Sequence, residues 1–280
     1  MKYFVLSVDF EEWFHSNWFN PAEVMAHHFG GKTPETDLRT TTRRLLDLFE
    51  DYSIKSTFFC LLNTSQRYPE AFREIVASGH EIALHGIDHQ NGESQQQFGK
   101  SLCFGKDALE ELSGSKVLGY RAPNFKMPLW GFKELSDSGF LYDSSLIPCL
   151  SIPGWYGSAK TPTHPYKVFT ERSYLFEFPL TVFPVLRLPG SGGWFLRNFG
   201  LNWVKTLFKL HLKRNDLAVL YLHPWEVSYE NPLLPEIPFH VFRRTGRWTL
   251  ESLKRLIETF RDQVHFTSFQ EYLKDNGVDV

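Results

Sequence analysis

The chain has 280 residues, of which 42% are hydrophobic and 22% charged, and its formal net charge is −2. This is the composition of a soluble globular protein, and without long basic blocks nucleic acid is not expected as a partner, because phosphate binding needs clustered Lys and Arg. No stretch approaches the roughly 18 apolar residues of a membrane span, so none is expected. The aromatic content of 16% suits a large core or stacking on sugar rings.

The cysteines and the N-terminal segment bear on the cellular compartment. Cys60, Cys103 and Cys149 make an odd count without metal-type spacing, so no disulfide framework is expected. The N-terminal apolar run is interrupted at Asp9, so it does not predict a signal peptide. Together these features favour a reduced, cytoplasmic protein.

Strands and helices alternate along the chain. Apolar runs predict strands at residues 3–8, 56–62, 81–84, 117–120, 140–142, 217–222 and 264–267, with one or two more in 175–185. Helical periodicity predicts helices at residues 36–52, 69–78, 94–112, 130–138, 201–213 and 249–260. The segment 148–165 is rich in Pro, Gly, Ser and Trp and indicates a structured loop over the site. Without a repeat or a convincing linker, we expect parallel βαβ units in one domain over residues 1–280.

Polar side chains gather just past the predicted strands, where α/β folds place their active sites. Asp9 and Glu11 end the first strand and project to the same side of it, because strand side chains alternate with period 2. Two neighbouring carboxylates repel, so a positive group should share their space. Taken alone, the pair is equally an acidic turn after a strand.

Two histidines follow another strand. His85 and His89 stand four residues apart directly after the run 81–84. Neutral imidazoles suit zinc and similar metals, and a carboxylate from elsewhere commonly completes the ligand set. A lone pair at this spacing also fits ordinary surface or core histidines. Joined to the acidic pair at another strand end, it indicates a metal site with an open position for water.

Six motifs in a familiar order extend over nearly the whole chain. They are Ser7-Val-Asp9-Phe-Glu11, the Ser56-Thr-Phe-Phe strand, residues 79–89, Arg121-Ala-Pro123, Tyr142-Asp143-Ser-Ser, and Leu220-Tyr-Leu-His223-Pro-Trp-Glu226. In this order they resemble the polysaccharide deacetylases of the NodB-homology group, carbohydrate esterase family 4. Residues 190–194, 223–226 and 243–245 resemble the leaderless deacetylases associated with exopolysaccharide or surface-glycan gene clusters.

The resemblance implies a fold and a set of roles. The fold would be α/β, an incomplete (β/α)7 barrel, holding one divalent metal, usually zinc. Asp9 would be the catalytic base, kept ionised by Arg121, and His223 would be the general acid, oriented by Asp143. The metal ligands would be Glu11, His85 and His89.

The implied reaction is hydrolysis of the acetamide of an N-acetylated sugar or glycan intermediate in a surface-glycan pathway. Two alternatives are an amide hydrolase acting on a cyclic ureide or imide, and a non-catalytic glycan-binding relative. Because Asp9 and His223 are both retained beside the metal ligands, the non-catalytic alternative is disfavoured.

Substrate contacts are predicted at Pro123, Asn124, Trp194 and Trp225. Together with Trp155, the two tryptophans could form a sugar platform, with core packing as the alternative. The Gly-rich run 190–193 indicates a turn and not a phosphate loop, since no Gly-Lys-Ser/Thr follows it.

The chain also departs from the family pattern at three places. Phe10 separates the two acidic residues, which leaves Glu12 as a competitor of Glu11 for the metal. Asn124 stands where an aromatic residue is common. No Trp follows Asp143, although the family usually has one that packs on the acid histidine.

Overall fold

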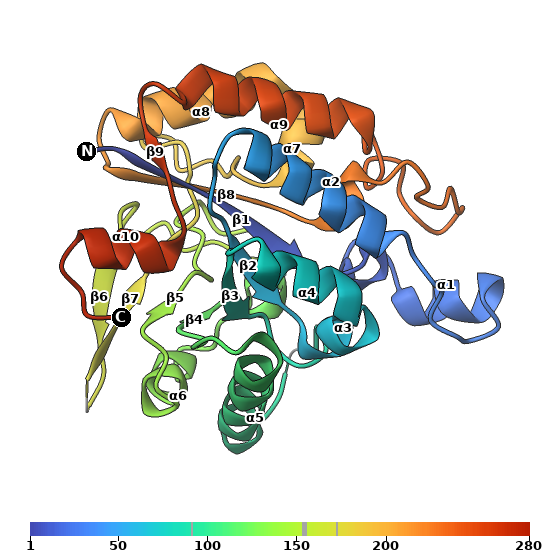
Figure 1. Cartoon of the computed structure of the whole chain (residues 1–280), viewed down its shortest axis with the longest axis horizontal. Helices are drawn as coiled ribbons and strands as arrows, with labels where there is room; N and C mark the ends of the chain where they lie inside the picture. The colour runs from blue at the N-terminus through green and yellow to red at the C-terminus, as the bar shows by residue number, and fades with distance from the viewer. Residues whose placement is uncertain (91, 153–155, 172) are drawn as a thin grey trace.

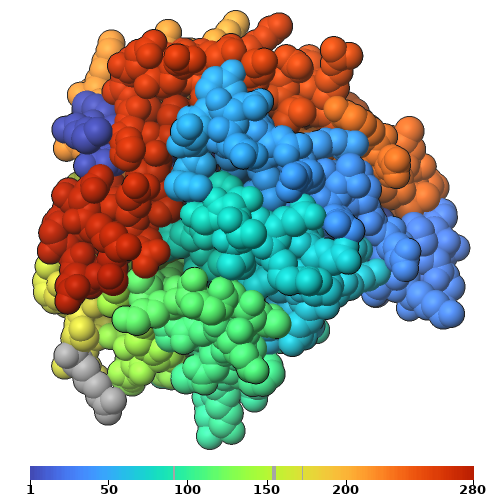
Figure 2. Space-filling model, viewed as in Figure 1, coloured from blue at the N-terminus to red at the C-terminus, as the bar shows by residue number. Residues whose placement is uncertain are grey.

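The computed structural model describes residues 1–90, 92–152, 156–171 and 173–280. One sheet runs through these residues in the order β6-β7-β5-β4-β3-β2-β1-β8, with β9 beside β1. Neighbouring strands are parallel, except that β6 and β7 form an antiparallel pair. Helices cover its outer face, and the chain starts and ends on the same side of the molecule (Figure 1). Figure 2 shows the molecule from the same side in space-filling form, with segments that follow one another in the chain packed side by side on this face.

The longest described strands are β1, with eight residues, and its neighbour β8, with six. The bounds of the strands are β1 (Tyr3–Phe10), β2 (Thr57–Cys60), β3 (Glu81–Leu84), β4 (Gly119–Tyr120), β5 (Tyr142–Asp143), β6 (Tyr166–Phe169), β7 (Tyr174–Glu177), β8 (Leu217–Leu222) and β9 (His265–Phe266).

The helices lie mostly between consecutive strands. They are α1 (Pro21–His28), α2 (Leu38–Asp51), α3 (Leu62–Arg67), α4 (Pro69–Ala77), α5 (Gln95–Ser113), α6 (Gly131–Asp137), α7 (Gly193–Phe199), α8 (Leu201–Leu212), α9 (Arg247–Phe260) and α10 (Phe269–Asp275). Three 3₁₀ turns, η1 (Trp13–His15), η2 (Pro123–Phe125) and η3 (Pro224–Val227), complete the described elements. No helix in the described part of the chain is both long and apolar enough to cross a bilayer.

Strand β1 separates two hydrophobic clusters, because its side chains alternate between the two faces of the sheet. Phe4, Leu6 and Val8 belong to the cluster between the sheet and the helices. Tyr3 and Val5 belong to the cluster inside the curled sheet. The same alternation carries Asp9 toward the interior, at the C-terminal end of the strand. The strand is buried along its whole length, on both faces of the sheet.

Irregular backbone bridges the gap between β7 and β8. Leu180 donates its N–H to the Leu146 carbonyl, and Tyr221 donates to the Ser191 carbonyl. Gly192 forms an isolated parallel bridge with Tyr221. The sheet therefore curls toward closure through a segment that contains no long strand.

The predicted alternation of strands and helices is confirmed, with β3 and β8 at the predicted bounds. Several short elements were not predicted, namely α1, α3, α7, α10 and β6. Most of these elements are too short to show a clear periodicity of apolar residues. The start of α7 is hidden by the Gly-rich run, which was interpreted as a turn. The described parts of the 148–165 segment are irregular, as predicted.

We expect Gly119→Ala to destabilise the fold. A Cβ at Gly119 would lie 1.9 Å from Cζ of Tyr142, a fully buried ring whose hydroxyl donates to Glu81. Displacing that ring should lower the free energy of unfolding by about 2 kcal/mol or more. Gly99→Ala is the matched control, because its new Cβ meets only the flexible end of Glu134. Denaturant unfolding measures both, and equal stabilities would contradict the packing described.

Candidate active site

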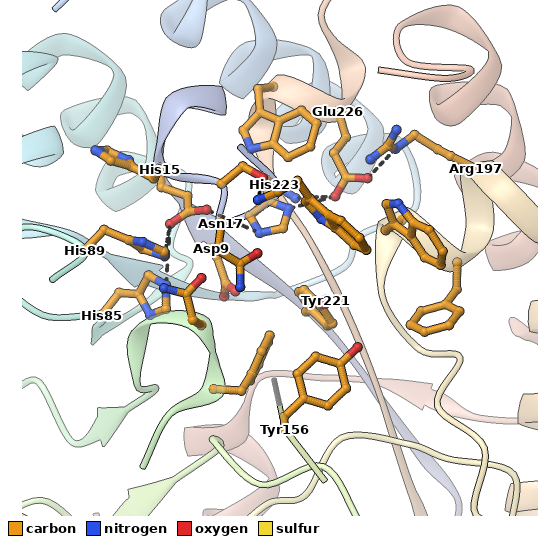
Figure 3. Close-up of a pocket in the computed structure, with 18 residues that line it drawn as sticks. Asp9, His15, Asn17, His85, His89, Tyr156, Arg197, Tyr221, His223 and Glu226 are labelled. Carbon is orange, nitrogen blue, oxygen red and sulfur yellow. Dashed lines mark hydrogen bonds and ion pairs between the residues drawn. The ribbon is translucent and has the colours of Figure 1, made fainter. Parts of the chain in front are cut away.

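A pocket opens at the C-terminal ends of β1, β3 and β8. Figure 3 shows His85 and His89 on one side of it, Glu226 and Arg197 on the other, and Asp9 and His223 between them. The described residues that line it are Asp9, Glu11, His15, Ser16, Asn17, Trp18, His85, His89, Asn124, Phe125, Tyr156, Trp194, Phe195, Arg197, Tyr221, His223, Trp225 and Glu226.

Glu11, His85 and His89 converge at one point of the pocket. Glu11 Oε2 lies 2.9 Å from His89 Nε2 and 3.6 Å from His85 Nε2. One ligand atom from each residue lies within 4.8 Å of the other two. The structure thus brings together the three residues that the sequence predicts as ligands.

The chemistry of this group suits a cation. The Nδ1 of His85 lies 2.8 Å from the Arg121 carbonyl, which can only accept, so Nδ1 carries the proton. In the neutral imidazole Nε2 then presents a lone pair toward Glu11, as expected of a metal-ligating histidine oriented by a second hydrogen bond. Glu11 Oε2 is buried and has no hydrogen-bond partner among the described residues. Two electron-pair donors facing each other repel unless a cation lies between them.

The electrostatics keep Glu11 ready to bind such a cation. Burial opposes ionisation of its carboxyl, but the nearby His89, His85 and His223 outweigh this effect. They hold the pKa of Glu11 well below its usual range, so the group is a carboxylate at neutral pH.

Glu12, the competing candidate, faces another way. Its Oε1 accepts hydrogen bonds from Tyr68 at 2.8 Å and from Thr36 at 3.3 Å, and Arg67 lies 3.7 Å from Oε2. These contacts tie the loop after β1 to α3. The geometry favours Glu11 over Glu12 as the ligand.

Asp9 is held by a buried arginine. Arg121 Nη1 lies 2.6 Å from Asp9 Oδ1 and also donates to Ser7 Oγ, while its Nε and Nη2 donate to the carbonyl and hydroxyl of Ser144. Its guanidinium lies 4.0 Å from the centre of the Phe59 ring. Because a buried carboxylate needs a positive partner to remain ionised, this contact supports the predicted role of Arg121.

His223 pairs with Glu226. Its Nδ1 lies 2.8 Å from Glu226 Oε1, and Glu226 Oε2 accepts from Arg197 Nε at 2.6 Å. Burial alone would lower the pKa of His223, but Glu226, Glu11 and Asp9 raise it to about 8. Burial also opposes ionisation of Glu226, yet Arg197 and His223 keep its pKa below the usual value.

The prediction that Asp143 orients His223 is wrong. Asp143 lies on β5, and among the described residues no hydrogen bond or ion pair joins its carboxyl to His223, whose Nδ1 is held by Glu226. Its carboxyl accepts from the Ser145 hydroxyl at 2.6 Å and the Ser145 N–H at 3.0 Å. Burial and Asp143 together raise the pKa of the neighbouring Glu177 well above its usual range. Asp143 thus belongs to an internal carboxyl pair, and Glu226 holds the acid histidine.

The predicted substrate contacts divide into two groups. Asn124, Trp194 and Trp225 line the pocket, and Trp155 lies outside the described residues. Pro123 is not among the described lining residues, and it is buried next to Gly86. Trp225 stacks on His223 with ring centres 5.2 Å apart. The ring that packs on this histidine therefore follows it in the chain, two residues later.

Most of the aromatic residues that line the pocket, which together form its aromatic wall, were not predicted from the sequence. Trp18 stacks on Trp194 with ring centres 5.2 Å apart, and His15 stacks on His89 at 5.5 Å. Tyr156 and Tyr221 line another part of the pocket. His15, Trp18 and Tyr156 come from loops or a short turn, which no strand-end pattern could indicate, and Tyr221 lies within β8. The sequence could have indicated Glu226 as the partner of His223, because Glu226 lies three residues after it in the same short turn.

Two family models match successive parts of the chain. Residues 31–130 match the model described as polysaccharide deacetylase. This part of the chain is related to the polysaccharide deacetylases. Residues 144–274 match a domain of unknown function, DUF3473. Strands from both segments belong to one sheet, and the pocket takes His85 from the polysaccharide deacetylase segment and His223 from the other.

Curated relatives support the same relationship over a limited region. A peptidoglycan deacetylase of Helicobacter pylori is 31% identical over 111 residues, which cover 37% of this chain and 36% of that protein. A peptidoglycan deacetylase-like protein of Gibberella zeae is 34% identical over 114 residues, covering 39% of this chain and 33% of that protein. The chain thus spans about a third of the length of the curated relatives that it matches.

Solved structures share the fold along almost the whole chain. A putative polysaccharide deacetylase from Mycobacterium smegmatis matches with a TM-score of 0.69 at 22% identity, covering 99% of this chain and 92% of that one. The Puue allantoinase matches with a TM-score of 0.65 at 18% identity and the same coverage. The predicted α/β fold, the incomplete barrel of the polysaccharide deacetylases, is confirmed.

We expect Glu11, and not Glu12, to be needed for metal binding. After dialysis against zinc, the parent protein should hold about one ion per chain, and Glu11→Gln should bind at least about tenfold more weakly, because it removes a ligand charge. Glu12→Gln is the matched control and should bind like the parent. Metal analysis and calorimetric titration distinguish them. Loss of zinc with Glu12→Gln alone would reverse the assignment.

Proposed function

We propose that this protein is a metal-dependent N-deacetylase, which hydrolyses the acetamide of an N-acetylated sugar in a surface-glycan or exopolysaccharide pathway. The observation that carries the proposal is the donor group of Glu11, His85 and His89, which shares one pocket with Asp9 and His223. The matched family segment and the deacetylase relatives support the same chemistry. The cytoplasmic location remains a prediction.

Hydrolysis of an acetamide makes three demands on a site. Water must lose a proton as it attacks, the carbonyl oxygen must be stabilised as it gains charge, and the departing nitrogen must gain a proton. A divalent metal held by Glu11, His85 and His89, most simply zinc, would polarise the carbonyl and acidify water. The protein's own residues must supply the proton transfers.

Asp9 is placed to take the proton from water. Its Oδ1 is bound by Arg121, which leaves the other carboxylate oxygen for the pocket. The buried guanidinium favours the ionised form, the only form that can act as a base. As the water oxygen bonds to the acetamide carbon, Asp9 receives the displaced proton.

His223 is placed to return a proton. Glu226 holds Nδ1, so Nε2 is the atom directed at the pocket, where it lies 3.4 Å from Glu11 Oε1. With its pKa raised to about 8, the imidazole is mostly protonated at neutral pH. Donation from Nε2 lets the C–N bond break, giving acetate and the free amino sugar, and Asp9 and His223 then exchange protons with solvent.

The aromatic lining suits a sugar ring. Trp194, Phe125 and Tyr156 line the pocket with apolar ring surface, and Asn124 adds an amide that can donate and accept. Asn124 has a φ of 54°, a conformation that Asn tolerates better than most residues. Stacking surface with a few polar groups is the usual composition of a small-molecule pocket.

A second candidate is ring opening of a cyclic ureide, because the allantoinase shares the fold over almost all of this chain. The same base and acid would serve either substrate. Incubation with N-acetylglucosamine oligosaccharides and with allantoin separates the two. Acetate release, with the free amine in equal amount, supports the proposal, whereas ureide hydrolysis without acetate release would overturn it.

Asp9→Asn should abolish most activity and leave the zinc in place. A general base contributes about 10²-fold or more to the rate, and the amide cannot accept the proton. Initial rates of acetate release and the zinc content are measured on the same sample. If zinc leaves together with the carboxylate, Asp9 is a ligand and the assignment of the base is wrong.

Glu226→Gln should move the alkaline limb of the rate profile to lower pH. His223 donates only when protonated, so activity falls as pH rises through its pKa of about 8. Removing the negative partner lowers that pKa. Asp143→Asn, which affects a carboxyl remote from His223, should leave the limb in place. Thermal unfolding checks that each variant is folded, and a shift with Asp143→Asn alone would contradict the pairing.

A further inference from the structure

One face of the molecule carries exposed apolar side chains and an excess of positive charge. The 38 residues from Phe178 to Asn215 contain six Lys or Arg and no Asp or Glu, although the whole chain has a net charge of −2. They form the turn at 183–188 together with α7 and α8, which lie beside each other along one edge of the molecule (Figure 1). We call this surface the cationic face.

Large apolar side chains stand out from the cationic face. The exposed fractions are 69% for Val185, 65% for Leu186, 54% for Phe199 and 41% for Leu210. Leu150, 55% exposed, lies next to the turn, because its N–H donates to the Arg187 carbonyl. Exposed apolar side chains grouped on a cationic surface mark an interaction site.

A row of aromatic rings connects this face to the pocket. Trp194, which lines the pocket, contacts Phe199 with ring centres 5.8 Å apart. Phe199 stacks on Trp203 at 5.0 Å, and Trp203 meets Phe183 at 4.8 Å. Phe183 opens the turn that carries Val185 and Leu186. The row therefore runs from the catalytic pocket to the most exposed apolar residues of the face.

The positive charges are available to a partner. Lys205, Lys209, Lys213 and Arg214 lie on or just after α8, and none has a carboxylate partner within the described ranges. By contrast, Arg197 is buried and bound to Glu226. Arg243 and Arg244 reach the carbonyls of Asn198 and Arg197, which adds charge where α7 meets α8.

We propose that the cationic face binds an anionic lipid bilayer, with Val185, Leu186 and Phe199 entering the interface and the α8 lysines over the lipid headgroups. Basic residues beside exposed Trp, Phe and Leu are the composition of interfacial membrane-binding segments. The pocket would then open at the bilayer surface, where a glycan on a lipid carrier could reach it. This inference concerns where the protein acts, and it does not depend on which bond is hydrolysed.

A soluble glycan fits this face less well. Sugar rings stack on free aromatic faces, but here the rings are occupied by one another, with Trp203 stacked against Phe199 at an interplanar angle of 29°. Val185, Leu186 and Leu210 are aliphatic and offer neither a ring face nor a hydrogen bond. An uncharged glycan would also gain no electrostatic attraction from lysines that lack a carboxylate partner.

The test is co-sedimentation of the full chain with vesicles of phosphatidylcholine alone or mixed with phosphatidylglycerol. Binding should require phosphatidylglycerol and weaken as salt is added. The double variant Val185→Ser/Leu186→Ser should bind roughly tenfold more weakly, because it removes two inserted apolar side chains. Lys205→Gln/Lys209→Gln should also weaken binding and flatten its salt dependence.

Matched controls come from the opposite edge of the molecule. Leu129 is 94% exposed and precedes α6, far from α8 in Figure 1, so Leu129→Ser should bind like the parent. Lys100→Gln/Lys116→Gln, in and just after α5, is the charge control. Unchanged unfolding midpoints show that the variants fold. The proposal is overturned by equal binding to both vesicle types, by equal loss in the controls, or by capture of a soluble glycan that the same cationic-face variants abolish.

Discussion

Two arginines buried away from solvent organise the site. Arg121 and Arg197 are among the largest fully buried side chains, and each holds a carboxylate at 2.6 Å. Burying a guanidinium is costly unless its charge is paired and most of its donors are bonded, so several segments meet around each one. Of these donors, Arg197 Nη2 is buried without a hydrogen-bond partner among the described residues. Arg121 joins the end of β1 to the loop after β5 through Asp9 and Ser144, and Arg197 joins α7 to η3 and to the carbonyls of Val241 and Arg243.

The three carboxylates of the pocket lie in three different environments. Arg121 restrains the carboxylate of Asp9, and the carboxylate of Glu226 contacts the imidazole of His223, whose pKa it raises. Glu11 has only imidazoles beside it, and one of its oxygens is buried without a hydrogen bond. Environment, and not residue type, therefore distinguishes the proposed base, the proposed support of the acid and the proposed metal ligand. The two family segments meet here, since His85 follows β3 in one segment and His223 follows β8 in the other.

The sequence predicted those parts of the site that depend on strand ends. Asp9, Glu11, His85 and His89 follow from period-2 alternation and ligand spacing, because parallel strands end at one edge of a sheet. The role of Asp143 was implied by the resemblance, and it failed because Asp143 is paired with Ser145 and Glu177 while Glu226 holds His223. The true partner, Glu226, returns to His223 through a 3₁₀ turn of four residues. The aromatic wall depends on loop contacts such as Trp18 against Trp194, which no local pattern records.

The central claim is that Glu11, His85 and His89 hold the metal while Asp9 remains bound to Arg121. Anomalous diffraction from crystals soaked in zinc tests it most directly. The account predicts one strong peak within bonding distance of the two Nε2 atoms and the Glu11 carboxylate, with the contact between Asp9 and Arg121 intact. A peak coordinated by Asp9, or zinc bound elsewhere with this trio empty, would contradict it.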